Sequence, residues 1–142
     1  MEPNESTGQN GMLLRTDLRY RKRRDQVVEG MKQETIDRIR KFTSDRDWEQ
    51  YHTPANLAKS ISIEANELLE CFQWSDADFD LEHVKEELAD VMVYCRNMLD
   101  ELGLDEDEII NAKMAKNEAK YPVELAKGSA EKYTELKKKS EQ

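Results

Sequence analysis

The sequence predicts an all-α protein, a bundle of about four helices whose core is completed by oligomerisation. Apolar residues recur at three- and four-residue spacing along most of the chain, and no alternating strand pattern or internal repeat appears. Charged residues make up 37% of the 142 residues, well above the usual share of about 25%. A chain this short and this charged has little apolar surface for a core, so we expect a second copy to cover part of it.

The chain divides into three parts. We expect a flexible basic extension over residues 1–31, a folded domain over 32–136 and a polar tail over 137–142. Residues 15–24 hold six basic residues and one acidic residue, although the whole chain has a formal charge of −9. This stretch is either a flexible or partly helical extension, which we favour, or an arm that contacts an anionic partner. Met31 is a second candidate start of the protein.

The first helix of the folded domain is predicted from residue 32 onwards. Ile36, Ile39 and Phe42 recur at helical spacing and can share one face. The charged stretch 44–47 ends this pattern, so the helix is expected to stop there.

The second helix is predicted over about 54–74. Thr53 offers a hydroxyl that can cap a helix, and Pro54 has the backbone angle that suits the first helical position. An acidic loop over 75–80 then separates this helix from the next one.

Two further helices follow the acidic loop. Asp80 can cap the third helix, and Gly103 can end it because glycine accepts a left-handed conformation without strain. Asp105 can cap the fourth helix, with Glu108 three residues later as a variant of the capping box. Pro122 ends that helix.

Charge and hydropathy argue against two classes of function. A formal charge of −9 disfavours general binding to nucleic-acid polymers. No apolar run approaches the ~18 residues of a membrane span, and the polar start does not resemble a signal peptide. We therefore expect a cytoplasmic protein with no membrane partner. Cys71 and Cys95 fall on the predicted helices near the core and are interpreted as packing residues.

Two carboxylate pairs give the clearest indication of function. Glu64 and Glu67 are three residues apart on one predicted helix, so they share a face and repel each other. Glu87 and Asp90 repeat this spacing on the next helix, and a hairpin would bring the two pairs to within about 3 Å of the same level. Convergent carboxylates suit Mg²⁺, with Mn²⁺ as a possible substitute. Alternatively, these acids, among 31 Asp and Glu residues, only solvate the helices.

Aromatic and basic residues offer candidate substrate contacts. Trp48 and Trp74 occupy positions where a flat base could stack on an indole, although both rings could instead cover the small core. Lys113, Lys116 and Lys120 recur on one face of the fourth helix. Alone this face is typical of a solvated surface, whereas beside a metal site it could contact phosphate.

Several motifs occur in order between residues 35 and 136. They are Arg46-Asp47-Trp48-Glu49-Gln50-Tyr51-His52, Glu64-Ala65-Asn66-Glu67-Leu68-Leu69-Glu70, Phe72-Gln73-Trp74, Glu86-Glu87-Leu88-Ala89-Asp90-Val91, Lys113-Met114, Asn117, Tyr121-Pro122 and Lys132-Tyr133-Thr134-Glu135-Leu136. Together these segments resemble the MazG-like all-α nucleoside triphosphate pyrophosphohydrolases, and within them the dCTP pyrophosphatase branch.

The resemblance implies a reaction, a metal and an assembly. The expected reaction is hydrolysis of a nucleoside triphosphate between its α and β phosphates, first of all dCTP or a modified dCTP, in control of the nucleotide pool. Mg²⁺ is the expected cofactor, and a homodimer or homotetramer is the expected assembly. A nucleotide-binding module that does not hydrolyse its ligand, or an antitoxin-like helical interaction protein, stays open as an alternative.

The resemblance also implies roles for individual residues. Glu64, Glu67, Glu87 and Asp90 match the family's metal ligands and are the expected catalytic residues, with either Glu64 or Glu67 orienting or deprotonating the attacking water. The expected substrate contacts are Trp48, Glu49, Gln50, Tyr51, His52, Trp74, Tyr94, Lys113, Asn117 and Lys120.

Overall fold

The structure is a computed structural model that describes residues 29–141. Residues 37–141 belong to one compact unit and residues 29–36 to another. The elements are α2 (Gln33–Ser44), the 3₁₀ helix η1 (Trp48–Tyr51), α3 (Pro54–Glu70), α4 (Leu81–Leu102), α5 (Glu106–Lys120), α6 (Val123–Ala126) and α7 (Tyr133–Ser140). No strand occurs between residues 29 and 141, so the predicted all-α class is confirmed. The basic stretch 15–24 lies outside the described residues.

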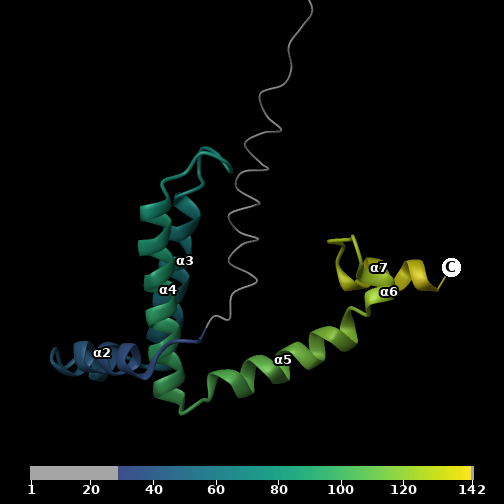
Figure 1. The fold of residues 1–142 in the computed structure, drawn as a ribbon. Helices are drawn as coiled ribbons and strands as arrows, with labels where there is room; N and C mark the ends of the chain where they lie inside the picture. The colour runs from purple at the N-terminus through teal and green to yellow at the C-terminus, as the bar shows by residue number, and fades with distance from the viewer. Residues whose placement is uncertain (1–28, 142) are drawn as a thin grey trace, which may run out of the picture. The chain divides into compact units, whose positions relative to one another are not determined.

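The helices α3 and α4 pack side by side as an antiparallel hairpin (Figure 1). The Thr53 hydroxyl accepts a hydrogen bond from the backbone N–H of Asn56 at 3.2 Å and caps α3. The Asp80 carboxylate accepts from the backbone N–H groups of Glu82 and His83 and caps α4. Both predicted starts are confirmed because these caps depend only on neighbouring residues.

The predicted end of α3 near Trp74 was wrong, since the helix stops at Glu70. Beyond this point the backbone N–H groups of Phe72 and Gln73 bond to carbonyls only three residues back, as in a tight turn. The chain therefore leaves the helix axis before Trp74 and enters the loop that joins α3 to α4.

The end of α4 and the start of α5 agree with the sequence analysis, whereas the chain after Pro122 differs from it. Gly103 ends α4 with a left-handed φ of 61°, and the Asp105 carboxylate caps α5 by accepting from the N–H of Glu108 at 2.9 Å. Two short helices that the sequence analysis did not predict, α6 and α7, follow Pro122. The helix α7 continues across the predicted domain limit at residue 136. That limit and the one at residue 31 stay predictions.

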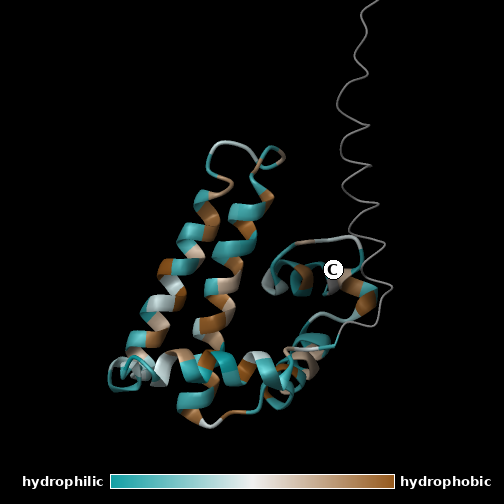
Figure 2. Cartoon of the chain, turned by 60° about the vertical axis from the view of Figure 1, so that its left-hand side comes forward, coloured by the Kyte–Doolittle hydropathy of each residue, from teal (hydrophilic) through white to brown (hydrophobic). Residues whose placement is uncertain are grey.

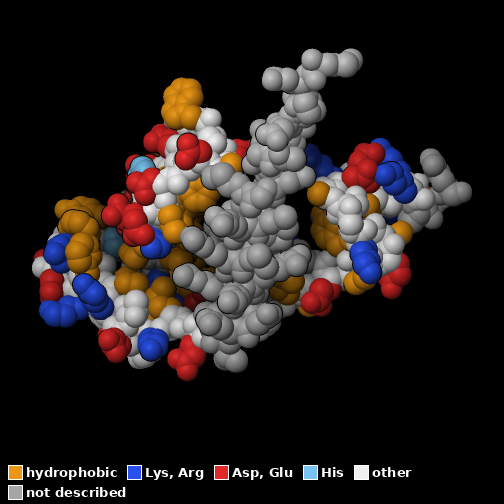
Figure 3. All heavy atoms as spheres, turned by 45° about the horizontal axis from the view of Figure 1, so that its top comes forward, with side chains coloured by type: hydrophobic (Ala, Val, Ile, Leu, Met, Phe, Trp, Pro, Cys, Tyr) orange, Lys and Arg blue, Asp and Glu red, His pale blue; other side chains and the backbone are white. Residues whose placement is uncertain are grey.

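The hairpin leaves much apolar surface open. Leu57 and Leu99 are buried, with 1% and 9% of their surface exposed, whereas Leu69 and Met92 expose 64% and 50%. Apolar segments recur along both helices (Figure 2), and apolar side chains lie open among charged ones (Figure 3). No helix between residues 29 and 141 is both long and apolar enough to cross a bilayer.

Candidate active site

The hairpin brings carboxylates from both predicted pairs together. Glu64 on α3 and Glu87 and Asp90 on α4 each place one carboxylate oxygen within 4.8 Å of the others. Glu67 lies outside this group of three but close enough to Glu64 to affect its titration. We call Glu64, Glu87 and Asp90 the carboxylate cluster.

The charges in the carboxylate cluster repel one another. Burial raises the pKa of the Glu64 carboxyl, and the negative charges of Glu67, Asp90 and Glu87 raise it further. Such a shift is the expected result of gathering carboxylates in a partly buried place without a cation. A divalent cation with hard oxygen ligands would remove this cost, so the donor set fits a metal such as Mg²⁺ or Mn²⁺.

The two oxygens of the Glu87 carboxylate differ in their contacts. His83, one helical turn earlier, places its Nε2 3.0 Å from Oε1 of Glu87. The other oxygen, Oε2, is buried and has no hydrogen-bond partner among the described residues. Buried polar atoms rarely lack partners, so this oxygen is suited to bind an ion. The four-residue spacing of His83 and Glu87 could have indicated this contact from the sequence.

A pocket of about 280 Å³ opens beside the carboxylate cluster. Its lining residues come from η1, α3 and α4 and from the segment between η1 and α3, namely Trp48, Tyr51, His52, Asn56, Leu57, Ser60 and Tyr94. Ser60 stands one turn before Glu64 on α3, and Tyr94 stands one turn after Asp90 on α4, so this pocket adjoins the cluster. We call it the aromatic pocket. Four predicted substrate contacts, Trp48, Tyr51, His52 and Tyr94, meet there.

A second pocket, of about 490 Å³, lies between α2, η1 and α4. We call it the polar pocket because its lining residues are Arg40, Lys41, Thr43, Ser44, Glu49, His52, Asn97, Asp100 and Glu101. His52 lines both pockets. Asn97, which the sequence analysis missed, is only 9% exposed. Its position three residues after Tyr94 would have indicated that it shares the functional face of α4.

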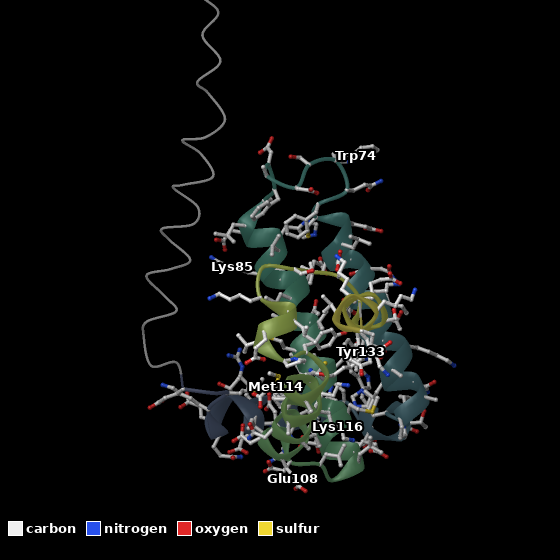
Figure 4. All side chains as sticks on the ribbon, turned by 90° about the vertical axis from the view of Figure 1, so that its right-hand side faces the viewer. Trp74, Lys85, Glu108, Met114, Lys116 and Tyr133 are labelled. Atoms are coloured by element: carbon white, nitrogen blue, oxygen red, sulfur yellow. The ribbon has the colours of Figure 1, made fainter. Side chains whose placement is uncertain are left out.

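The other predicted substrate contacts lie elsewhere. Trp74 stands in the turn between α3 and α4 with 90% of its surface exposed (Figure 4). Lys113 and Asn117 are on α5 and line neither the aromatic nor the polar pocket. Lys120 places its ammonium 5.2 Å from the ring centre of Tyr133, near α7. The Gln50 amide donates to the backbone carbonyl of Asp47 at 2.9 Å.

Comparison with known proteins agrees with these features. The model of the MazG-like family matches residues 59–136, a segment that contains both carboxylate pairs. The dCTP pyrophosphatase 1 of rat is 38% identical over 115 residues, covering 72% of this chain and 68% of the rat protein; the human protein is 35% identical with the same coverage. A crystal structure of a pyrophosphatase from Archaeoglobus fulgidus is similar with a TM-score of 0.57 and 38% identity, covering 68% of this chain and 99% of that one.

Proposed function

Because the chain belongs to the MazG-like family and is a nucleoside triphosphate pyrophosphohydrolase, we propose that its substrate is dCTP or a modified dCTP. Hydrolysis of the α–β phosphate bond, with Mg²⁺ as cofactor, gives the monophosphate and pyrophosphate. The observation that carries this proposal is the carboxylate cluster, which adjoins a pocket lined by three aromatic side chains. We place the activity in the cytoplasm, in control of the nucleotide pool.

The four carboxylates have separate roles in this proposal. Glu64, Glu87 and Asp90 would hold the metal, which when bound would neutralise phosphate charge and lower the pKa of a water molecule. Glu67 lies beside Glu64 but outside the group of three, so in this proposal its carboxylate orients the attacking water and accepts its proton. This placement favours Glu67 over Glu64 as the base.

The aromatic pocket receives the sugar and one face of the base. Trp48 is 43% exposed and packs edge-on against Phe42, with 5.6 Å between the ring centres, so part of the indole stays open to the pocket. Stacking of a base on such a ring contributes about 1 to 3 kcal/mol. Tyr94, one turn beyond Asp90 on α4, also lines this pocket, and in this proposal it contacts the sugar.

A homodimer or homotetramer completes the site. Leu88 and Met92 on α4 expose 45% and 50% of their surface in a single chain, which favours coverage by another copy. Trp74, Lys113, Asn117 and Lys120 do not line the pockets beside α4. In this proposal they reach the nucleotide from a second copy of the chain.

The proposal is tested by pyrophosphate release. The protein is incubated with Mg²⁺ and each of the common deoxy- and ribonucleoside triphosphates, and both pyrophosphate and monophosphate are measured. We expect release from dCTP, loss of release in Glu64→Gln, and normal release in Glu86→Gln, which changes an exposed neighbour of Glu87. Equal release from the wild type and Glu64→Gln would contradict the assigned site, and release only from another nucleotide would contradict the proposed substrate.

A further inference from the structure

We propose that Asn97 reads the nucleobase, and that the polar pocket selects a base with an exocyclic amino group, such as cytosine. This inference rests on the proposed function because it takes the phosphates to lie at the carboxylate cluster. It assigns recognition of the base to one residue and one pocket, which neither the family resemblance nor the four metal ligands do.

Asn97 presents an amide to the polar pocket. The residue is only 9% exposed, lines this pocket, and its side chain makes no hydrogen bond to any residue between 29 and 141. The amide atoms are not among the fully buried polar atoms, so they stay accessible to a ligand that enters the pocket. A carboxamide both donates and accepts. The matching ligand is therefore an edge that presents a donor next to an acceptor, as the edge of a nucleobase does.

The position of Asn97 along α4 agrees with this role. Asp90, Tyr94 and Asn97 follow one another at spacings of four and three residues, so they share one helix face. At about 1.5 Å per residue, Tyr94 stands about 6 Å and Asn97 about 10 Å beyond Asp90. The metal ligand Asp90, the ring of Tyr94 and the amide of Asn97 thus follow one another along α4 in the same order as phosphate, sugar and base in a nucleotide. His52 lines both pockets and so connects the two parts of this path.

The positive charges in the polar pocket are already neutralised. Arg40 donates to both oxygens of Asp100, at 2.9 and 2.7 Å. Lys41 donates to both oxygens of Asp45, at 2.9 and 2.6 Å. Because neither cation is left without a carboxylate, the pocket suits an uncharged group better than a phosphate.

The remaining charges favour an amino group on the ligand. Glu49 and Glu101 also line the polar pocket, and Glu101 stands one turn beyond Asn97 on the same face of α4. An ionised carboxylate only accepts hydrogen bonds. A wall that combines these acceptors with the Asn97 amide therefore favours cytosine, which carries an amino group, over uracil or thymine, which do not.

The test measures binding, so it does not depend on turnover. Calorimetry gives the dissociation constants of α,β-methylene dCTP and of the same analogue of 2-pyrimidinone deoxyriboside, which lacks only the amino group, both with Mg²⁺. We expect the wild type to prefer the cytosine compound by about 10- to 100-fold. Asn97→Ala should remove this preference and leave binding of the pyrimidinone compound within about 3-fold. Asn111→Ala on α5 is the matched control and should keep the preference.

Each outcome has a distinct meaning. A preference retained in Asn97→Ala, equal weakening of both compounds, or no binding of either one would overturn the inference. Asn97→Leu, which is nearly isosteric and has neither the donor nor the acceptor, replaces the alanine variant if that variant does not fold. If the wild type shows the preference and Asn97→Ala loses it, but the wild type releases no pyrophosphate from dCTP, the proposed function fails and the role of Asn97 stands.

Discussion

Arg40 binds both carboxylate oxygens of Asp100, with its Nε donating to Oδ2 at 2.9 Å and a terminal nitrogen donating to Oδ1 at 2.7 Å. This pair joins α2 to α4 across 60 residues of sequence. Arg96 adds a third bond to Oδ1 at 2.8 Å from within α4. Because η1 follows α2 by only a short turn, the pair also fixes where Trp48 stands relative to α4.

The Arg40–Asp100 pair should make stability depend on pH in the acid range. The hydrogen bond from Arg40, followed by that from Arg96, lowers the pKa of Asp100. A carboxyl whose pKa is lowered by folding stabilises the protein above its unfolded pKa of about 4, and this contribution is lost as the pH falls through the folded value. Asp100→Asn should therefore lower the free energy of unfolding at pH 7 by about 1 kcal/mol.

Urea unfolding at pH 7 and again near pH 3 measures this effect. The difference between the wild type and Asp100→Asn should shrink at the lower pH, because below the unfolded pKa of about 4 the carboxyl binds a proton in the unfolded chain and its stabilising contribution decreases. Asp78→Asn, an exposed change in the loop between α3 and α4, is the control and should cause no such difference. A gap of the same size at both pH values would show that the charge of Asp100 does not contribute.

Metal binding should stabilise the fold even without nucleotide. A cation at the carboxylate cluster would offset the repulsion that raises the pKa of Glu64. Saturating Mg²⁺ or Mn²⁺ should raise the midpoint of thermal unfolding by about 5 °C or more. Glu87→Gln should remove most of this increase, whereas Glu86→Gln should retain it. An equal increase in all three proteins would place the stabilising ion elsewhere.

His83 should position Glu87 for metal binding. Its Nε2 lies 3.0 Å from Oε1 of Glu87 and leaves the buried Oε2 for an ion. Residues that orient metal ligands typically change metal affinity by about 10- to 100-fold, and since the His83 side chain is 51% exposed we expect the lower end for His83→Ala. Mn²⁺ affinity, measured by the loss of the free-ion EPR signal, gives the result.

Substitution of His83 by glutamine separates positioning from a general loss of structure. The glutamine amide can still donate to Glu87 from one turn away. His83→Gln should therefore bind Mn²⁺ more tightly than His83→Ala. Identical affinities for the two variants and the wild type would mean that the contact has no effect on the ion.

The two tryptophans should contribute differently to nucleotide binding. Trp48 lines the aromatic pocket, whereas Trp74 is 90% exposed in the turn between α3 and α4. Trp48→Ala should weaken binding of α,β-methylene dCTP by about 10-fold at every protein concentration. Trp74→Ala should weaken binding only where the protein is oligomeric, because we propose that Trp74 reaches the site from a second copy.

Titration of the same analogue at protein concentrations above and below the association midpoint distinguishes the tryptophans. Sedimentation at each concentration gives the assembly state. A loss of affinity in Trp74→Ala under conditions where only monomer is present would contradict the proposed contribution from a second copy.

Local chemistry explains which elements could be predicted. The starts of α3, α4 and α5 were predicted because Thr53, Asp80 and Asp105 cap helices within three residues of their own position. The end of α3 was not, because the pattern of apolar residues continues to Phe72 while the backbone has already turned. The short helix α7 was missed because its polar, lysine-rich sequence carries a weak helical period, although Leu136 is buried.

The sequence by itself determined the helical class, the caps and the two carboxylate pairs, because spacings of three and four residues fix which side chains share a helix face. Only the tertiary structure decided that Glu64, Glu87 and Asp90 converge while Glu67 stays outside, and that Asn97 is buried. Those outcomes depend on how α3 packs on α4 and on the contact between Arg40 and Asp100, which join residues far apart in the chain. Periodicity within one helix carries no information about such contacts.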